Sequence, residues 1–202
     1  LLQAGSPFGY LLASLFYWVA FSAVGWRNMF IIGMVPGFLV AAYILLYVKE
    51  SPDWLRRKVG PKASMWQAVR SHMPLMIFAI VLMTAINFYS HGTQDLYPSA
   101  FLRVQHGFSV STVSMIAIAY SVGAVVGCIS IASLSQWIGR RKAIIGAALL
   151  SIPVIPLWAF SSDPVYLALG AVLMQFLVQG CFGVVPAYLN ELSPPNVRAT
   201  FP

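Results

Sequence analysis

Long apolar stretches, each separated from the next by a short polar segment, repeat along this chain. Each stretch is close to the roughly 20 residues that a helix needs to cross the hydrocarbon core of a bilayer. None shows the alternation of apolar and polar residues that is typical of strands in a membrane barrel. We therefore expect an all-α membrane protein with six transmembrane helices, at residues 7–25, 29–48, 74–98, 110–132, 143–160 and 165–190.

The third apolar stretch ends in a polar run from Asn87 to Asp95 that interrupts the membrane pattern. On a helix, Asn87, His91 and Asp95 are spaced i, i+4, i+8 and share one face, with Ser90 and Gln94 beside it. Ionisable side chains are costly in hydrocarbon, so such a face normally points into a helix bundle or a water-filled path. The pattern predicts a transport site.

Composition agrees with a membrane protein. The chain is 59% hydrophobic and 8% charged, with a mean hydropathy of +0.80, whereas soluble domains carry roughly a quarter charged residues. Cys128 and Cys181 lie inside apolar stretches and are expected to be small buried side chains. No zinc-type spacing occurs, and we expect neither a metal nor a cofactor.

The placement of basic residues predicts the orientation in the membrane. Of the 12 Lys and Arg residues, only Arg27 and Arg103 lie outside the loops at 49–73 and 133–142 and the C-terminal end. The positive-inside rule places both loops and both chain ends in the cytoplasm. The net charge of +7 therefore reflects membrane topology, and we expect a lipid bilayer and no nucleic acid as partner.

Glycines and prolines predict local features of the bundle. Gly123 and Gly127 form a GxxxG pattern that allows close helix contact. Pro153 and Pro156 predict a break in the fifth span, and Pro186 a bend in the sixth. The basic, Pro- and Gly-containing stretch at 49–73 is expected to be a cytoplasmic linker between two groups of helices.

His91 and Asp95 are candidates for proton coupling. Imidazole is the side chain that ordinarily titrates near neutral pH, and a carboxylate one helical turn away is a natural partner for its proton. The alternative is that both residues solvate the outer end of the helix. We favour the functional interpretation because the whole polar run is involved.

Neutral polar side chains offer candidates for substrate binding. Their donors and acceptors suit a carboxylate or hydroxyl, although interhelical hydrogen bonds would use the same residue types. Gln175 and Gln179 share a face of the sixth span at i, i+4. This face and the polar face of the third span are candidates to line one cavity. The set comprises Asn87, Ser90, Thr93, Gln94, Gln175 and Gln179.

Other functional classes are weaker. The spacing His91-x-x-x-Asp95 also occurs in acyltransferases, but the chain offers no further nucleophile, metal ligands or phosphate-binding glycines, so we do not expect an enzyme. A non-transporting sensor with a transporter fold stays open. No Lys or Arg lies deep within an expected span, so a basic group for a substrate carboxylate is expected outside this chain.

Three cytoplasmic motifs resemble those of the major facilitator superfamily. They are the runs at 50–55 (ESPDWL), 133–142 (SLSQWIGRRK) and 190–198 (NELSPPNVR). In the second run Gln136 and Trp137 stand where that family usually has an acid and a base, while the Gly-Arg-Arg core is kept. By this resemblance a cytoplasmic gate would comprise Gly139, Arg140, Arg141, Glu191 and Arg198.

A narrower resemblance rests on the polar run. The pattern at 87–99 (NFYSHGTQDLYPS) is similar to the helix-seven signature of fungal lactate/pyruvate:proton symporters, in the sialate and monocarboxylate:proton symporter family, with Ser99 in place of Thr. The run from Gln175 to Leu192 is similar to the tenth helix of that family.

These resemblances imply a twelve-helix transporter of which this chain is an internal fragment. Residues 1–48 would be the last two helices of the N-terminal half, 49–73 the linker and 74–202 the first four helices of the C-terminal half. The expected function is proton-coupled transport of short monocarboxylates across the plasma membrane, with the missing helices of the same polypeptide as partners. The alternative is a carrier for a sugar or another neutral solute.

Overall fold

The computed structural model describes residues 2–50 and 70–193, and within them every regular element is a helix. This confirms the expected all-α class. The predicted linker at 49–73 lies almost wholly outside the described residues. The α-helices are α1 (Gly5–Tyr47), α4 (Met73–Gln94), α5 (Val110–Ile138), α6 (Arg140–Ser151), α7 (Ile155–Ala159) and α8 (Pro164–Leu192). Shorter elements are the 3₁₀ turns η1 (Leu2–Ala4) and η3 (Ile152–Val154) and the π-helical η2 (Tyr97–Gln105).

Five helical stretches in the described residues are long and apolar enough to cross a membrane: Ala23–Tyr47, Met73–Gln105, Val110–Ile138, Arg140–Ala159 and Pro164–Leu192. They match five of the expected spans. The sixth, at 7–25, corresponds to the beginning of α1, which is helical but is not among these five.

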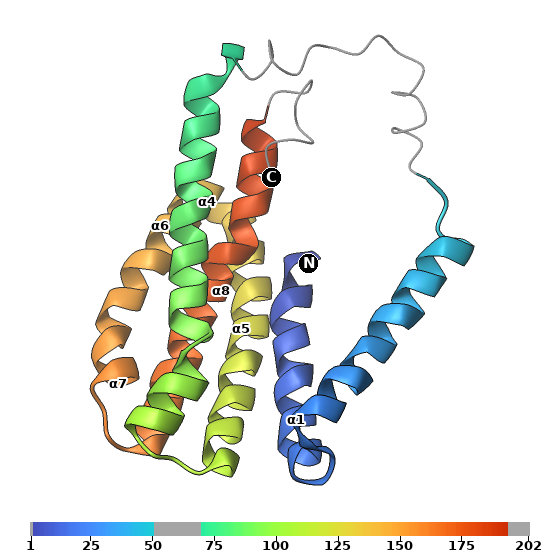
Figure 1. The fold of residues 1–202 in the computed structure, drawn as a ribbon. Coiled ribbons are helices and arrows are strands. Elements are labelled where there is room, and N and C mark those ends of the chain that lie inside the picture. The colour runs from blue at the N-terminus through green and yellow to red at the C-terminus, as the bar shows by residue number, and fades with distance from the viewer. Residues whose placement is uncertain (1, 51–69, 194–202) are drawn as a thin grey trace.

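The chain of α1 turns back on itself at Gly25. This glycine has φ 72° and ψ 162°, a conformation outside the helical region that is easy only for glycine. We call residues 5–24 the first arm and residues 26–47 the second arm (Figure 1). α1 packs against α5, whereas no residue in the most apolar part of Ala23–Tyr47 is buried.

α8 lies at the centre of the bundle and packs against α4, α5, α6 and α7. Its closest neighbour is α5, which runs beside it (Figure 1). A Cβ atom on Gly127 would collide with the backbone of Phe176, and one on Gly123 would lie 2.8 Å from the carbonyl oxygen of Val172. The predicted close helix contact at the GxxxG pattern is therefore confirmed.

Two apolar clusters form the interior. One joins α4, α5, α6 and α8, and the other joins η2, α5 and α8. Most of the remaining large apolar side chains are exposed, which is the surface expected where helices face lipid. The buried members are Ala79, Ile86, Ile131, Ala143, Ile144, Ala147, Cys181, Val184, Val185 and Leu189 in the first cluster and Tyr97, Leu102, Ile116, Ala117, Tyr120, Leu167 and Ala171 in the second.

Some expected boundaries were wrong. The segment 133–142 is not an open loop, because α5 extends to Ile138 and α6 begins at Arg140. Gly139 alone separates them, with φ 94° and ψ 145°, so a single residue turns the chain. The fifth span is interrupted by η3 next to Pro153, as expected, whereas α8 continues through Pro186 as one helix.

The third span is longer than expected. The helical path continues beyond Gln94 into η2, so that the stretch Met73–Gln105 is 33 residues long. Pro98 has no N–H to donate and crowds the preceding turn. The backbone responds with wider i to i+5 bonds, such as Phe101 N to Leu96 O at 3.2 Å. Arg103, which lies between the expected spans at 74–98 and 110–132, therefore belongs to the continuous helical stretch.

Candidate functional site

The polar run at the end of α4 is divided into two faces. Ile86, Ser90 and Gln94 are spaced i, i+4, i+8 and are buried. His91 and Asp95 lie one residue further around the helix, and 57% and 44% of their side-chain surfaces are exposed. The run is therefore not one continuous lining, because one face packs into the bundle and the other stays accessible.

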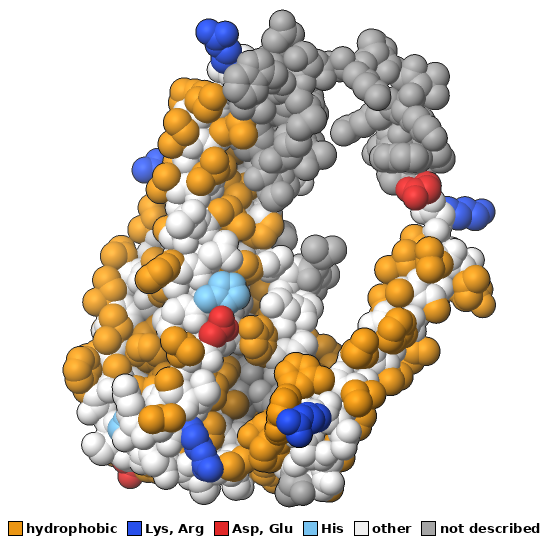
Figure 2. Space-filling model, viewed as in Figure 1, with side chains coloured by type: hydrophobic (Ala, Val, Ile, Leu, Met, Phe, Trp, Pro, Cys, Tyr) orange, Lys and Arg blue, Asp and Glu red, His pale blue; other side chains and the backbone are white. Residues whose placement is uncertain are grey.

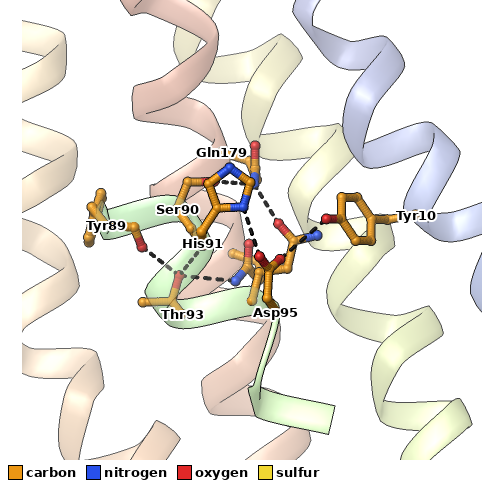
Figure 3. Close-up of polar contacts among 9 residues, drawn as sticks. Tyr10, Tyr89, Ser90, His91, Thr93, Asp95 and Gln179 are labelled. Atoms are coloured by element: carbon orange, nitrogen blue, oxygen red, sulfur yellow. Dashed lines mark hydrogen bonds and ion pairs between the residues drawn. The ribbon is translucent and has the colours of Figure 1, made fainter. Parts of the chain in front are cut away.

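The exposed face carries an ion pair between His91 and Asp95. His91 Nδ1 lies 2.9 Å from Asp95 Oδ2, as their i, i+4 spacing suggested. The Tyr10 hydroxyl donates to the other carboxylate oxygen, Oδ1, at 3.2 Å. Tyr10 belongs to the first arm of α1, and Figure 3 shows it reaching across to Asp95 from that separate helix. The Asp95 carboxylate thus links the His91 imidazole to the first arm of α1.

In Figure 2, acidic and histidine side chains meet near the middle of a face that is otherwise largely hydrophobic and uncharged. A charged group in such a setting has few competing partners, because the nearby surface offers little polar solvation of its own. Proton movement at this pair would therefore change the local charge of the face.

The buried face joins α4 to α8 through glutamines. Gln179 Nε2 donates to Ser90 Oγ at 3.0 Å and to Gln94 Oε1 at 2.8 Å (Figure 3). Gln175 Nε2 donates to Thr93 Oγ1 at 3.2 Å. These bonds are interhelical contacts of the kind that the sequence left as an alternative to substrate binding. Within the described residues, the Nε2 groups of both glutamines therefore donate hydrogen bonds to acceptors of the protein itself.

Asn87 is half-buried and turns toward its own helix. Its Nδ2 donates to the carbonyl oxygen of Met83 at 2.8 Å. Thr93 also bonds back, donating to the carbonyls of Tyr89 at 2.9 Å and Ser90 at 3.1 Å. Such bonds satisfy a polar side chain in an apolar setting without a ligand.

A cavity of about 430 Å³ opens beside this site, between the first arm of α1, the end of α4 with η2, and α5. Gln94 and Asp95 line it, and so do Tyr10, Arg103 and Ser114. Gln175 and Gln179 of α8 are not among its lining residues. The polar face of α8 therefore contacts the buried face of α4 but does not line this cavity. Its volume is within the roughly 300 to 1,000 Å³ that is typical of small-molecule sites.

Two buried atoms of the cavity wall have no hydrogen-bond partner in the part of the chain that the structure describes. They are Gln94 Nε2 and Ser114 Oγ, from residues that are 2% and 3% exposed. Buried polar atoms are normally satisfied, so such atoms in a cavity wall indicate where a ligand or water would bond.

Sequence reasoning missed most of the cavity wall, including Tyr10, Arg103 and Ser114. Tyr10 and Ser114 belong to no motif, and their role becomes visible only when α1 and α5 come together. Arg103 had a signal, since it is one of two basic residues on the expected outer side. The extension of the helix into η2 hid its position.

At the other end of the bundle, α6 and α8 are joined by an ion pair. Arg140 Nε lies 3.1 Å from Glu191 Oε1, and Arg140 Nη1 donates to Ser135 Oγ at 2.6 Å. Two residues of the expected cytoplasmic gate therefore meet, while Arg141 has no ion pair among the described residues and Arg198 lies outside them.

The described residues hold no group of three or more His, Cys, Asp or Glu side chains that is suited to a metal ion. Cys128 and Cys181 are buried free cysteines, as the apolar sequence around them indicated.

Several long apolar helices packed around a central one define a multi-pass membrane protein. Comparison with protein families agrees, since residues 1–201 match the model of the Major Facilitator Superfamily. The chain belongs to this superfamily. Curated relatives of the chain are named as transporters.

Among curated proteins, the chain is similar to a carboxylic acid transporter protein homolog of Saccharomyces cerevisiae, with 31% identity over 67% of this chain and 22% of that protein. It is 24% identical to the cis,cis-muconate transport protein of Acinetobacter baylyi over 98% of this chain and 50% of that protein. A sialic acid transporter of Escherichia coli is also 24% identical, over 86% and 43% respectively. The chain thus spans half or less of the length of these relatives. No solved structure gives a significant match.

Proposed function

We propose that this chain is part of a proton-coupled carrier that moves short monocarboxylates such as lactate and pyruvate across the plasma membrane. The observation that carries the proposal is the contact of His91 with Asp95 at 2.9 Å beside the cavity. An imidazole is the side chain that ordinarily gains and loses a proton in the physiological pH range, and a carboxylate oxygen beside it can accept a hydrogen bond from its N–H group. The pair therefore has the chemistry of a proton carrier.

The choice of substrate has separate support. Three relatives are named for the transport of organic acids: a carboxylic acid transporter homolog, a muconate transport protein and a sialic acid transporter. The signature at 87–99 resembles that of lactate/pyruvate:proton symporters, and Gln94 Nε2 of the same run has no hydrogen-bond partner among the described residues. We assign substrate recognition to Ser90, Thr93, Gln94, Asn87, Gln175 and Gln179, with their interhelical bonds exchanging for bonds to substrate during transport.

The proposal also covers the arrangement of the whole carrier. The chain would provide helices five to ten of twelve, with 49–73 joining two halves that rock around a central site. The ion pair of Arg140 with Glu191 would lie at the cytoplasmic end and hold α6 to α8 when that side is closed. Gly139, Arg141 and Arg198 would complete this gate, and both chain ends would be cytoplasmic.

The experiment is uptake of labelled lactate by the complete reading frame in cells that lack monocarboxylate carriers, with external pH recorded at the same time. We expect saturable uptake that removes protons from the medium and is competed by pyruvate. Uptake of a neutral sugar without a pH change would instead support the alternative of a neutral-solute carrier, and ligand binding without uptake would support a sensor.

The variant His91→Ala tests the proton pair. We expect it to lower coupled uptake and to flatten its pH dependence, because the proton carrier is gone. His72→Gln is the matched control, since His72 lies at the other end of α4 and glutamine keeps hydrogen-bonding capacity. If His91→Ala and His72→Gln show the same uptake from about pH 5 to 7 at equal surface expression, the role of His91 is refuted.

A further inference from the structure

The cavity between the first arm of α1, η2 and α5 has the chemistry of an anion site, although its wall contains an acidic residue. Its charged side chains within the described residues are Arg103 and Asp95. The guanidinium of Arg103 carries five N–H donors, and its one hydrogen bond among the described residues is from Nη1 to the carbonyl oxygen of Phe108 at 2.9 Å. Its other edge is therefore available to a carboxylate, which guanidinium binds in a two-pronged geometry.

Neutral groups in the same wall point to the same ligand. Gln94 Nε2 can only donate a hydrogen bond, and Ser114 Oγ can donate one. Both atoms are buried without a partner among the described residues and both side chains line the cavity. Gln94 cannot turn its carbonyl oxygen to the cavity without losing the bond from Gln179 at 2.8 Å. These two buried donors without acceptors, next to the exposed guanidinium of Arg103, favour a ligand that is rich in acceptors.

The remaining wall favours a ligand with an apolar body. The rings of Tyr10, Tyr17 and Tyr120 line the cavity, together with apolar side chains of α5. A space of about 430 Å³ is also much larger than a three-carbon acid requires. The best match is a carboxylate attached to an aromatic or otherwise bulky apolar group.

Charge balance selects one carboxylate and one proton. With neutral His91, the positive charge of Arg103 and the negative charge of Asp95 cancel, and a carboxylate would leave the site with one excess negative charge. When His91 takes up a proton, its contact with Asp95 neutralises that carboxylate, and Arg103 is left to bind the ligand. A second carboxylate on the ligand would again be uncompensated, which disfavours dicarboxylates.

We propose that this cavity is a binding site for bulky apolar monocarboxylates, with Arg103 holding the carboxylate and Gln94 and Ser114 completing its hydrogen bonds. The inference rests on the proposed function, since it gives the acid of that carrier a place to bind and extends its range beyond lactate. It also replaces the expectation that the basic group lies outside this chain.

Binding is tested on the purified full-length protein by thermal unfolding with benzoate, and with benzamide as the uncharged analogue of similar shape. A ligand that binds only the folded protein raises the unfolding midpoint in proportion to its affinity. We expect benzoate, and not benzamide, to raise the midpoint of the wild type. An equal shift by both compounds would overturn the carboxylate assignment.

Substitutions test whether Arg103 is the residue that binds the carboxylate. Arg103→Gln should weaken benzoate binding about tenfold, since a charge-assisted hydrogen bond is lost. Arg103→Lys should recover part of the affinity, because it keeps the charge but not the planar fork. Arg27→Gln is the matched control: it removes the other basic residue of the expected outer side, whose guanidinium lies over the Trp26 ring at 4.7 Å. Equal benzoate affinity in Arg103→Gln and Arg27→Gln would remove Arg103 from the site.

The pH dependence of benzoate affinity tests whether a proton on His91 contributes to binding in addition to the charge of Arg103. In the wild type, benzoate affinity should fall from about pH 5 to 8. In His91→Gln it should not fall, because no imidazole is present to take up a proton. An equal fall of affinity in His91→Gln and the wild type would overturn the proton-linked binding.

The two proposals fail in different ways. If the wild type shows proton-coupled lactate uptake but benzoate binding does not depend on Arg103, the cavity assignment is wrong and the transport proposal stands. If benzoate binding depends on Arg103 but lactate uptake is absent, the site stands and the proposed function is wrong.

Discussion

The hydrogen bond from Tyr10 to Asp95 leads to the sharpest prediction about how the helices cooperate. It links the first arm of α1 to the carboxylate that faces His91, at 3.2 Å. A hydrogen bond to a charged group contributes about 1.5 to 3 kcal/mol when buried. Asp95 is 44% exposed, so water replaces much of the lost bond and we expect about 1 kcal/mol.

The variant Tyr10→Phe removes the hydroxyl and keeps the ring. If the bond is made in the state that limits transport, a loss of about 1 kcal/mol lowers kcat/KM about fivefold. The assay is the initial rate of labelled lactate uptake over a range of concentrations, at equal surface expression.

The matched control is Tyr43→Phe. Tyr43 lies in the exposed second arm of α1, where its ring stacks on Tyr47 with 5.4 Å between centroids. It loses the same hydroxyl without touching the site. Equal kcat/KM values for Tyr10→Phe and Tyr43→Phe would refute the reasoning and leave the contact as an incidental one.

Three further predictions concern the bundle. Gly127→Ala should destabilise the protein by about 1 to 3 kcal/mol in thermal or denaturant unfolding, because the new methyl group meets backbone of α8, whereas Gly146→Ala has open space and should not. Gln179→Leu should lower the free energy of unfolding by about 1 to 2 kcal/mol, because it removes two interhelical hydrogen bonds. An unchanged free energy of unfolding would show that these bonds do not stabilise the bundle. Arg140→Glu should slow uptake, and adding Glu191→Arg should restore it; no rescue would argue against the ion pair as a gate.

The spans could be predicted from the sequence because the bilayer imposes a local rule. Every residue in a crossing helix must be compatible with hydrocarbon or with a neighbouring helix, so about 20 apolar residues in a row suffice to identify one. The His91–Asp95 contact could be expected for a similar reason, since residues at i, i+4 are neighbours on any helix. The break at η3 followed from Pro153 and Pro156.

The division of the polar run could not be predicted in this way. Helical spacing shows that Ser90, His91, Gln94 and Asp95 lie near one another, but not which of them a second helix covers. α8 covers the side of Ser90 and Gln94 through Gln179, which leaves His91 and Asp95 accessible. The length of the third span was missed because Pro98 reads as a helix stop, whereas the chain continues in π-helical form.

Sequence alone determined the class of this protein, its helices and the titratable pair, because each depends on residues that are close along the chain. Only the tertiary structure decided which groups share the cavity. Tyr10, Arg103 and Ser114 come from three separate elements with no common periodicity, and they meet because α1 and η2 pack on α5. Packing of distant segments depends on the shape of whole helix surfaces, such as the glycine face of α5 against α8, and no local pattern encodes that partner choice.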